Sequence, residues 1–247
     1  MSALSEFPIT KRWPARYADR IQLYSLTTPN GVKVSIMLEE TGLPYEAHYV
    51  SFDTNDQGSP EFRSLNPYGK IPAIIDPNGP GAKPLPLFES GAILIYLAEK
   101  SGQLMPADAA LRHETIQWLM FQMAGIGPMF GQVGFFNKFA GRHFEDKRPR
   151  DRYVAEAKRL LAVLDGRLAG RAWIMGDLYS IADIATFPWI RNLIGYYEAG
   201  DLVGIGEFTQ VTRVLGAFLA RPAVERGLEI PKRNPAQAVT TSSQSMR

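Results

Sequence analysis

Cysteine is absent from this chain of 247 residues. A protein without cysteine has no disulfide framework, no cysteine-ligated metal site and no cysteine nucleophile. Chemistry that needs a thiolate is therefore open to this protein only if another molecule brings the thiolate. The three histidines, His48, His113 and His143, lie far apart in the sequence and lack the spacing of metal ligands, so we expect no metal site.

A strong charge and long apolar runs are also absent. The formal net charge of +2 does not indicate the basic surface of a nucleic-acid-binding protein. No apolar run has the length of a transmembrane helix. The first twenty residues carry basic side chains without the apolar segment of a secretory signal, and Glu6 and Asp19 are atypical of a mitochondrial leader. We therefore expect a cytoplasmic protein that binds neither nucleic acid nor membrane.

The first half of the chain reads as an α+β domain. Asn30 is the expected N-cap of its first helix and Gly42 the residue that ends it. Hydrophobic periodicity and turn residues predict the order βαβαββα. The strands are expected over 21–26, 45–52, 73–76 and 85–88, and the later helices over 60–65 and 90–100.

After Gly102 the pattern is helical throughout. Ser180 and Asp183 have the spacing of a capping box, which favours a structural role for both. Helices are expected over 111–139 with an interruption at Gly127 and Pro128, and over 150–168, 180–197 and 208–220. The chain is thus expected to have an N-terminal extension (1–20), an α+β domain (21–102), an all-α domain (108–230) and a flexible tail (233–247).

Three short motifs stand at turns of the α+β domain. Residues 27–31, Thr-Thr-Pro-Asn-Gly, precede a helix whose N-terminal dipole would favour an anion or a thiolate. Residues 70–74, Lys-Ile-Pro-Ala-Ile, lead into a strand, and a cis Pro72 would leave the main chain of Ile71 open to an extended peptide.

The third motif is Phe-Glu-Ser-Gly-Ala-Ile, residues 88–93, at the start of another helix. Ser90 and the free N–H groups of that helix suit a carboxylate, and Glu89 suits an ammonium group. Taken singly, each motif also fits a plain capped turn or an ordinary trans proline. Their combination and order are more specific.

Together these motifs closely resemble the thioredoxin-fold domain of glutathione transferases. Residues 180–185, Ser-Ile-Ala-Asp-Ile-Ala, are similar to the signature of that family's all-α second domain. The likeness extends over residues 21–230. Several segments resemble the bacterial Nu class, whose members are glutathione-dependent disulfide reductases. These segments are TPNGVK, EETGLPYE, NPYGKIPAI, FESGAILIYLAEK and YSIADIA. A fungal nitrogen regulator is a more distant relative.

The resemblance implies a thioredoxin-like domain with a mixed four-stranded sheet, and a homodimer with each site near the subunit boundary. Glutathione would be the co-substrate, with Thr28 and Asn30 acting on its sulfur. The residues expected to bind glutathione are Asn30, Gln57, Lys70, Ile71, Pro72, Glu89, Ser90 and Arg152.

Combined with the missing cysteine, this site predicts that bound glutathione supplies the thiolate for disulfide exchange. A small disulfide would be the second substrate. Two alternatives remain open, namely conjugation of glutathione to an electrophilic small molecule and regulatory binding of glutathione without turnover. If disulfides are reduced, a second thiolate must resolve the mixed disulfide, so each subunit is expected to hold two glutathione molecules or one glutathione disulfide.

Overall fold

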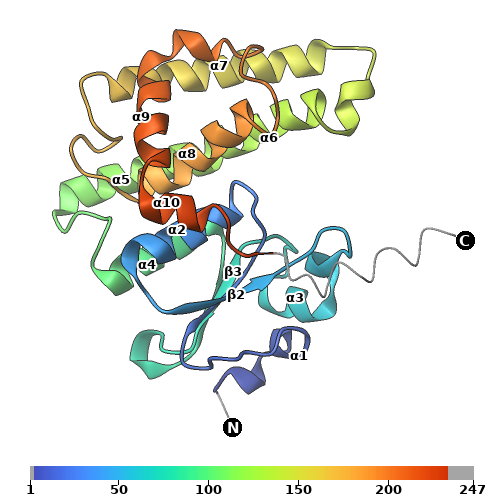
Figure 1. Cartoon of the computed structure of the whole chain (residues 1–247), viewed down its shortest axis with the longest axis vertical. Coiled ribbons are helices and arrows are strands. Elements are labelled where there is room, and N and C mark those ends of the chain that lie inside the picture. Colours follow the sequence, from blue (N-terminus) through green and yellow to red (C-terminus); the bar gives the residue numbers. More distant parts are fainter. Residues whose placement is uncertain (1–2, 233–247) are drawn as a thin grey trace, which may run out of the picture. The chain divides into compact units, whose positions relative to one another are not determined.

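The computed structural model describes residues 3–232, and the tail expected over 233–247 lies outside this part. The chain divides into two compact units (Figure 1). One comprises Met1–Ile93 and Arg226–Arg247, and the other comprises Leu94–Glu225. The division expected from the sequence, with its boundary after residue 102, stays a prediction.

The first unit follows the expected order βαβαββα behind a short N-terminal helix. Its strands are β1 (Ile21–Ser25), β2 (Tyr45–Tyr49), β3 (Ala73–Asp76) and β4 (Leu85–Phe88). Its helices are α1 (Ile9–Arg12), α2 (Gly31–Thr41), α3 (Pro60–Leu65) and the beginning of α4 (Ser90–Ser101), which continues into the second unit. Helix α2 ends as expected, with Gly42 in the left-handed conformation.

The four strands form one mixed sheet in the order β2-β1-β3-β4. Strand β1 is parallel to β2 and antiparallel to β3, and β3 is antiparallel to β4. The carboxyl ends of β1, β2 and β4 therefore lie at the same edge of the sheet as the beginning of β3. This edge receives all the loops that carry the predicted motifs.

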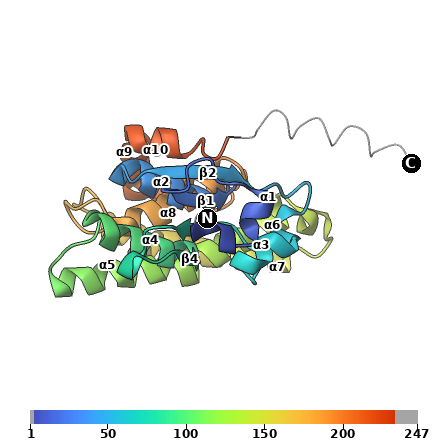
Figure 2. The same ribbon diagram turned by 90° about the horizontal axis from the view of Figure 1, so that it is seen from below.

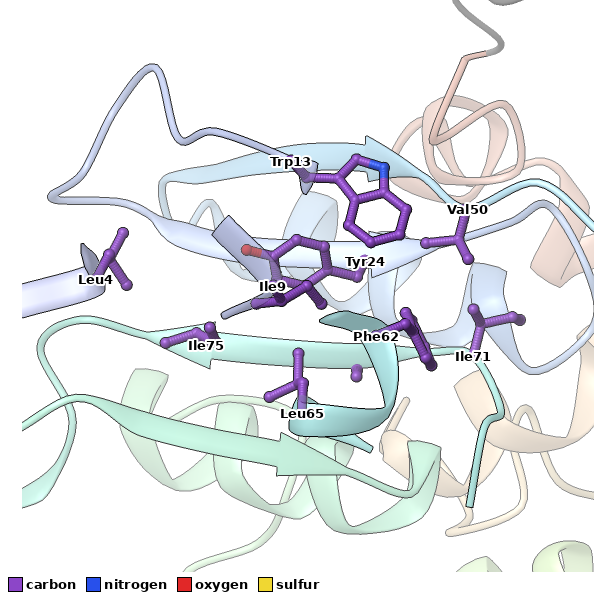
Figure 3. Close-up of a cluster of buried hydrophobic side chains, with 10 residues drawn as sticks. Leu4, Ile9, Trp13, Tyr24, Val50, Phe62, Leu65, Ile71 and Ile75 are labelled. Carbon is purple, nitrogen blue, oxygen red and sulfur yellow. The ribbon is translucent and has the colours of Figure 1, made fainter. Parts of the chain in front are cut away.

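The N-terminal segment packs on one face of this sheet. Leu4, Ile9 and Trp13 are buried in a hydrophobic cluster whose other members come from the strands, helix α3 and the loops beside them (Figure 3). The remaining members are Tyr24, Val50, Phe62, Leu65, Ile71, Ala73 and Ile75. Figures 1 and 2 show α1 beside α3 on this face, with α2 on the other side of the sheet. Leu4, Ile9 and Trp13 thus anchor the N-terminal segment in the core, and the short helix α1 was not predicted.

The second unit is helical. Helix α5 (Ala109–Phe121) passes through a π-helical turn (Gln122–Ile126) into α6 (Gly127–Asn137), so the expected interruption at Gly127 and Pro128 is the end of that turn. The remaining helices are α7 (Arg148–Leu168), α8 (Ile181–Ile194), α9 (Thr209–Leu219) and α10 (Pro222–Gly227), which crosses into the first unit. No helix among the described residues is long and apolar enough to cross a membrane.

The capping box predicted at Ser180 and Asp183 is present at the start of α8. The Ser180 side chain accepts hydrogen bonds from the helix, and the Asp183 carboxylate accepts one from the Ser180 N–H at 2.9 Å. Asp183 is fully buried and also accepts the Ile174 N–H at 2.9 Å. The box therefore joins the loop before α8 to the helix itself.

Candidate functional site

The register of the sheet gathers the predicted residues of the first unit at one edge. Ser25 and Tyr49 are paired at the carboxyl ends of β1 and β2, and Ala73 is paired with Phe88 at the beginning of β3 and the end of β4. Pro72 and Glu89 directly adjoin the latter pair. The turn before α2, the loop after β2, the Lys70–Pro72 segment and the start of α4 consequently surround one edge.

The turn before α2 is built around Thr28 and Gly31. The Gly31 N–H donates to the Thr28 hydroxyl at 3.2 Å, and the Val32 N–H donates to the Thr28 carbonyl at 3.0 Å. A Cβ atom on Gly31 would lie 1.8 Å from the carbonyl oxygen of Leu26, so only glycine fits there. Thr28 is held directly at the positive end of the α2 dipole.

Asn30 does not cap α2 as expected. It occupies the N-cap position, but its backbone is already helical, at φ −79° and ψ −37°, and its side chain makes no capping hydrogen bond. An N-cap side chain reaches its helix from an extended backbone, and here Thr28 satisfies the first N–H group instead. The Asn30 amide is therefore not engaged in capping α2.

The loop after β2 presents Gln57. This half-buried side chain donates through Nε2 to Oδ1 of Asn55 at 3.0 Å. Its Oε1 is buried and accepts no hydrogen bond from any residue in the described part of the chain. A buried amide oxygen without a donor is costly. Gln57 as a whole is half-buried in the loop after β2, and it remains the residue of this loop that the sequence predicts to bind glutathione.

The Lys70–Pro72 segment runs into β3 through a cis Ile71–Pro72 peptide bond. The side-chain amide of Asn66 stabilises this segment by donating a hydrogen bond to the Lys70 carbonyl at 2.6 Å. The Ile71 side chain is buried in the cluster of Figure 3, whereas Lys70 is exposed. Within residues 3–232 no hydrogen bond to the main chain of Ile71 is found. This main chain is positioned to pair with an extended peptide.

Glu89 and Ser90 form the junction between β4 and α4. Glu89 is exposed and has the left-handed backbone angle φ 71°, which non-glycine residues adopt at an energetic cost. Ser90 is buried and begins α4. The sharp turn places the Glu89 side chain in solvent beside a helix N-terminus that attracts a carboxylate. The pair can therefore meet both charged groups of an amino acid.

Sequence reasoning did not single out Lys33. This lysine is fully buried in α2, where every residue from 31 to 38 is buried, and its ammonium donates to the Ser90 hydroxyl at 3.3 Å. Burial lowers the pKa of Lys33 from 10.5 to about 7, against the opposing effect of the Glu89 carboxylate. The sequence did carry a signal for this burial, because Lys33 is a single charged residue within an apolar stretch of the helix.

Arg152, the remaining predicted residue, lies in α7 of the second unit and is exposed. Its inclusion in the site stays a prediction. Elsewhere in the described part of the chain, no group of three or more histidine, aspartate or glutamate side chains is placed to hold a metal ion.

Family models match both halves of the chain. The model for the N-terminal domain of glutathione S-transferase matches residues 27–100, and the model for the C-terminal domain matches residues 149–221. Among curated proteins, the disulfide-bond oxidoreductase YghU of Escherichia coli is 43% identical over 224 residues, which cover 87% of this chain and 76% of the relative. The disulfide-bond oxidoreductase YfcG of the same organism is 45% identical over 172 residues, covering 69% and 79% respectively.

Solved structures resemble this fold over almost its whole length. A glutathione transferase from Burkholderia graminis with two bound glutathione molecules per subunit is 75% identical with a TM-score of 0.93, covering 95% of this chain and 98% of that one. A glutathione transferase from Pseudomonas putida with one glutathione disulfide per subunit is 70% identical with a TM-score of 0.91. The match covers 92% of this chain and 99% of that one.

Proposed function

This chain belongs to the glutathione S-transferase family, and we propose that it reduces disulfides with glutathione in place of a cysteine of its own. One combination carries the proposal: the chain has no cysteine, and relatives at 43% and 45% identity are named disulfide-bond oxidoreductases. Disulfide exchange requires a thiolate. In this protein only a bound thiol can supply it.

The reaction has two exchange steps. The thiolate of the first glutathione attacks one sulfur of the substrate disulfide, so a glutathione–substrate disulfide forms and the other half leaves as a thiolate. The thiolate of a second glutathione then attacks the glutathione sulfur of that mixed disulfide. Glutathione disulfide forms, the second half of the substrate leaves, and both departing thiolates take up protons from solvent. Two glutathione molecules are oxidised for each disulfide reduced.

The residues at the sheet edge divide this task. Thr28 and the N-terminus of α2 stabilise the glutathione thiolate, with the Asn30 amide as a second donor. The main chain of Ile71, with Pro72 and Lys70 beside it, pairs with the extended middle of the tripeptide. The γ-glutamyl end meets Ser90 through its carboxylate and Glu89 through its ammonium group.

Two residues are assigned to the outer parts of the ligand. Gln57 contacts glutathione from the loop after β2, where the residue is half-buried. Arg152 contacts the second glutathione from the helical unit. Support for two thiols comes from the relatives of Burkholderia graminis and Pseudomonas putida, whose structures hold two glutathione molecules or one glutathione disulfide per subunit.

A homodimer in the cytoplasm completes the proposal. Cytosolic glutathione is kept mainly in its reduced form, which is the form that this reaction consumes. Light scattering tests the dimer, because it measures the molar mass of the assembled protein in solution.

Turnover with two kinds of second substrate tests the proposed reaction. The protein is supplied with glutathione and a small disulfide, and in parallel with glutathione and a chlorinated aromatic electrophile. We expect faster turnover of the disulfide. Preference for the electrophile would assign the protein to carbon conjugation, and glutathione binding without either reaction would assign it to binding or regulation.

A further inference from the structure

The N-terminal segment is fastened to the sheet close to the loop that carries Gln57. Trp13 is buried, with its ring edge-on to Tyr24 at 6.0 Å and to Phe62 at 6.4 Å between ring centroids (Figure 3). Its Nε1 donates to the carbonyl of Tyr49 at 3.1 Å. Since Tyr49 ends β2, this hydrogen bond joins the segment to the strand from which the Gln57 loop departs.

Arg12, the last residue of α1, extends the connection into the loop itself. Its guanidinium forms an ion pair with the carboxylate of Asp56 and lies 5.2 Å from the centroid of the Trp13 ring. The Asp56 side chain is almost wholly buried, with 7% of its surface exposed, whereas that of Arg12 is 41% exposed. Arg12 thus brings a positive charge to a buried carboxylate from the solvent side.

Asp56 organises the loop. Its carboxylate accepts the Ser51 N–H at 2.9 Å and the Thr54 hydroxyl at 2.9 Å, while its own N–H donates to the Ser51 carbonyl at 2.9 Å. A buried carboxylate keeps such bonds only while its charge is compensated. Without Arg12, the loop has to bring Asp56 toward water, and Gln57 is the next residue.

The position of Gln57 is sensitive to such a change. Its side chain donates a hydrogen bond to Asn55, which has the left-handed backbone angle φ 52°. On its other side, a Cβ atom at Gly69 would lie 3.2 Å from the Gln57 carbonyl oxygen. The loop is therefore closely fitted against the Gly69 turn, and a shift at Asp56 displaces the Gln57 amide.

We propose that Arg12 is a positioning residue for glutathione, acting through Asp56 to hold the 51–58 loop in the conformation that presents Gln57 to the ligand. The inference rests on the proposed glutathione site, but it does not depend on the reaction that follows binding. It gives the N-terminal segment a part in ligand recognition in addition to its part in the core.

Calorimetric titration of glutathione into the Arg12→Met variant tests the proposal. We expect the affinity for glutathione to fall about tenfold, the equivalent of one lost hydrogen bond. The matched control is Lys11→Met, which removes an exposed charge from the same helix and should bind like the wild type. Arg12→Lys keeps the charge and should recover most of the affinity.

A double-mutant cycle separates positioning from general destabilisation. If Arg12 acts through Gln57, Arg12→Met should cost almost no further affinity in a Gln57→Ala background. Hydrogen exchange should show faster exchange of the 51–58 amides in Arg12→Met than in Lys11→Met. This difference in the loop can still be measured if Arg12→Met is less stable than the wild type. Unchanged affinity in Arg12→Met, or full additivity with Gln57→Ala, would overturn the proposal. A wild type that does not bind glutathione would overturn the proposed site itself.

Discussion

Lys33 shows how one residue can carry a large electrostatic cost in this fold. An ammonium group loses its hydration when it is buried, and the Ser90 hydroxyl at 3.3 Å replaces only part of that hydration. Because an ammonium only donates, this contact directs the Ser90 proton away from Lys33 while the lysine is charged. The buried lysine thereby orients the hydroxyl proposed to bind the glutathione carboxylate.

The lowered pKa of Lys33 predicts a specific dependence of stability on pH. Between pH about 7 and 10.5 the unfolded chain binds one more proton at this residue than the folded chain. The free energy of unfolding should therefore rise with pH in this window, by about 1.4 kcal/mol per pH unit from this group. In Lys33→Met this contribution should vanish.

Urea unfolding at pH 8 and pH 9 measures the effect. The exposed Lys83→Met variant should keep the wild-type slope. If Lys33→Met showed the same slope as the wild type, the ammonium of Lys33 would have to be charged in the folded protein throughout this range.

Asn30 and Ser90 are expected to act at opposite ends of glutathione. Asn30→Ala should lower the turnover number more than the affinity, since an amide that stabilises sulfur charge is worth about 2.7–4 kcal/mol in the transition state. Ser90→Ala should act mainly on affinity, through the γ-glutamyl carboxylate. Steady-state kinetics with calorimetry distinguishes the two. Equal losses of affinity with unchanged turnover in both variants would contradict this division of roles.

At the scale of elements, helix α8 depends on the carboxylate of Asp183. It accepts hydrogen bonds from the N–H groups of Ile174 and Ser180 at 2.9 Å and from the Ser180 hydroxyl at 3.1 Å, all within the second unit. Asp183→Ala removes the half of the capping box that accepts the Ser180 N–H and leaves the buried Ile174 N–H without an acceptor. The free energy of unfolding should fall by about 2–4 kcal/mol.

Thermal or urea unfolding checks this, with the exposed Asp177→Ala in the same loop as control. Turnover per folded molecule should be retained in Asp183→Ala. A wild-type melting temperature together with abolished turnover would instead move Asp183 from the framework of the fold to the chemistry.

At the scale of the whole molecule, the missing cysteine has a consequence for stoichiometry. No side chain can resolve the mixed disulfide, so the second thiolate must be bound beside the first to avoid a slow encounter from solution. Titration calorimetry should give two glutathione molecules, or one glutathione disulfide, per subunit. Saturation at one glutathione, with no affinity for the disulfide, would favour conjugation or simple binding.

Much of the fold follows from local patterns in the sequence. The order βαβαββα, the strands at 73–76 and 85–88, Gly42 at the end of α2 and the capping box at Ser180 were all predictable. Each depends on residues only a few positions apart, whose periodicity and turn chemistry act through the backbone. The sequence alone also established that any thiolate in the reaction belongs to another molecule.

Contacts between distant residues were decided by the tertiary structure alone. Lys33 meets Ser90 across 57 positions, and Arg12 meets Asp56 across 44. The sequence around each residue does not show which partner it meets, because these partners are brought together only by the packing of distant segments. Asn30 has the right type for an N-cap, yet the turn around Thr28 and Gly31 gives that hydrogen bond to Thr28. Local chemistry sets which elements form, whereas packing sets which charges are buried and what they hold in place.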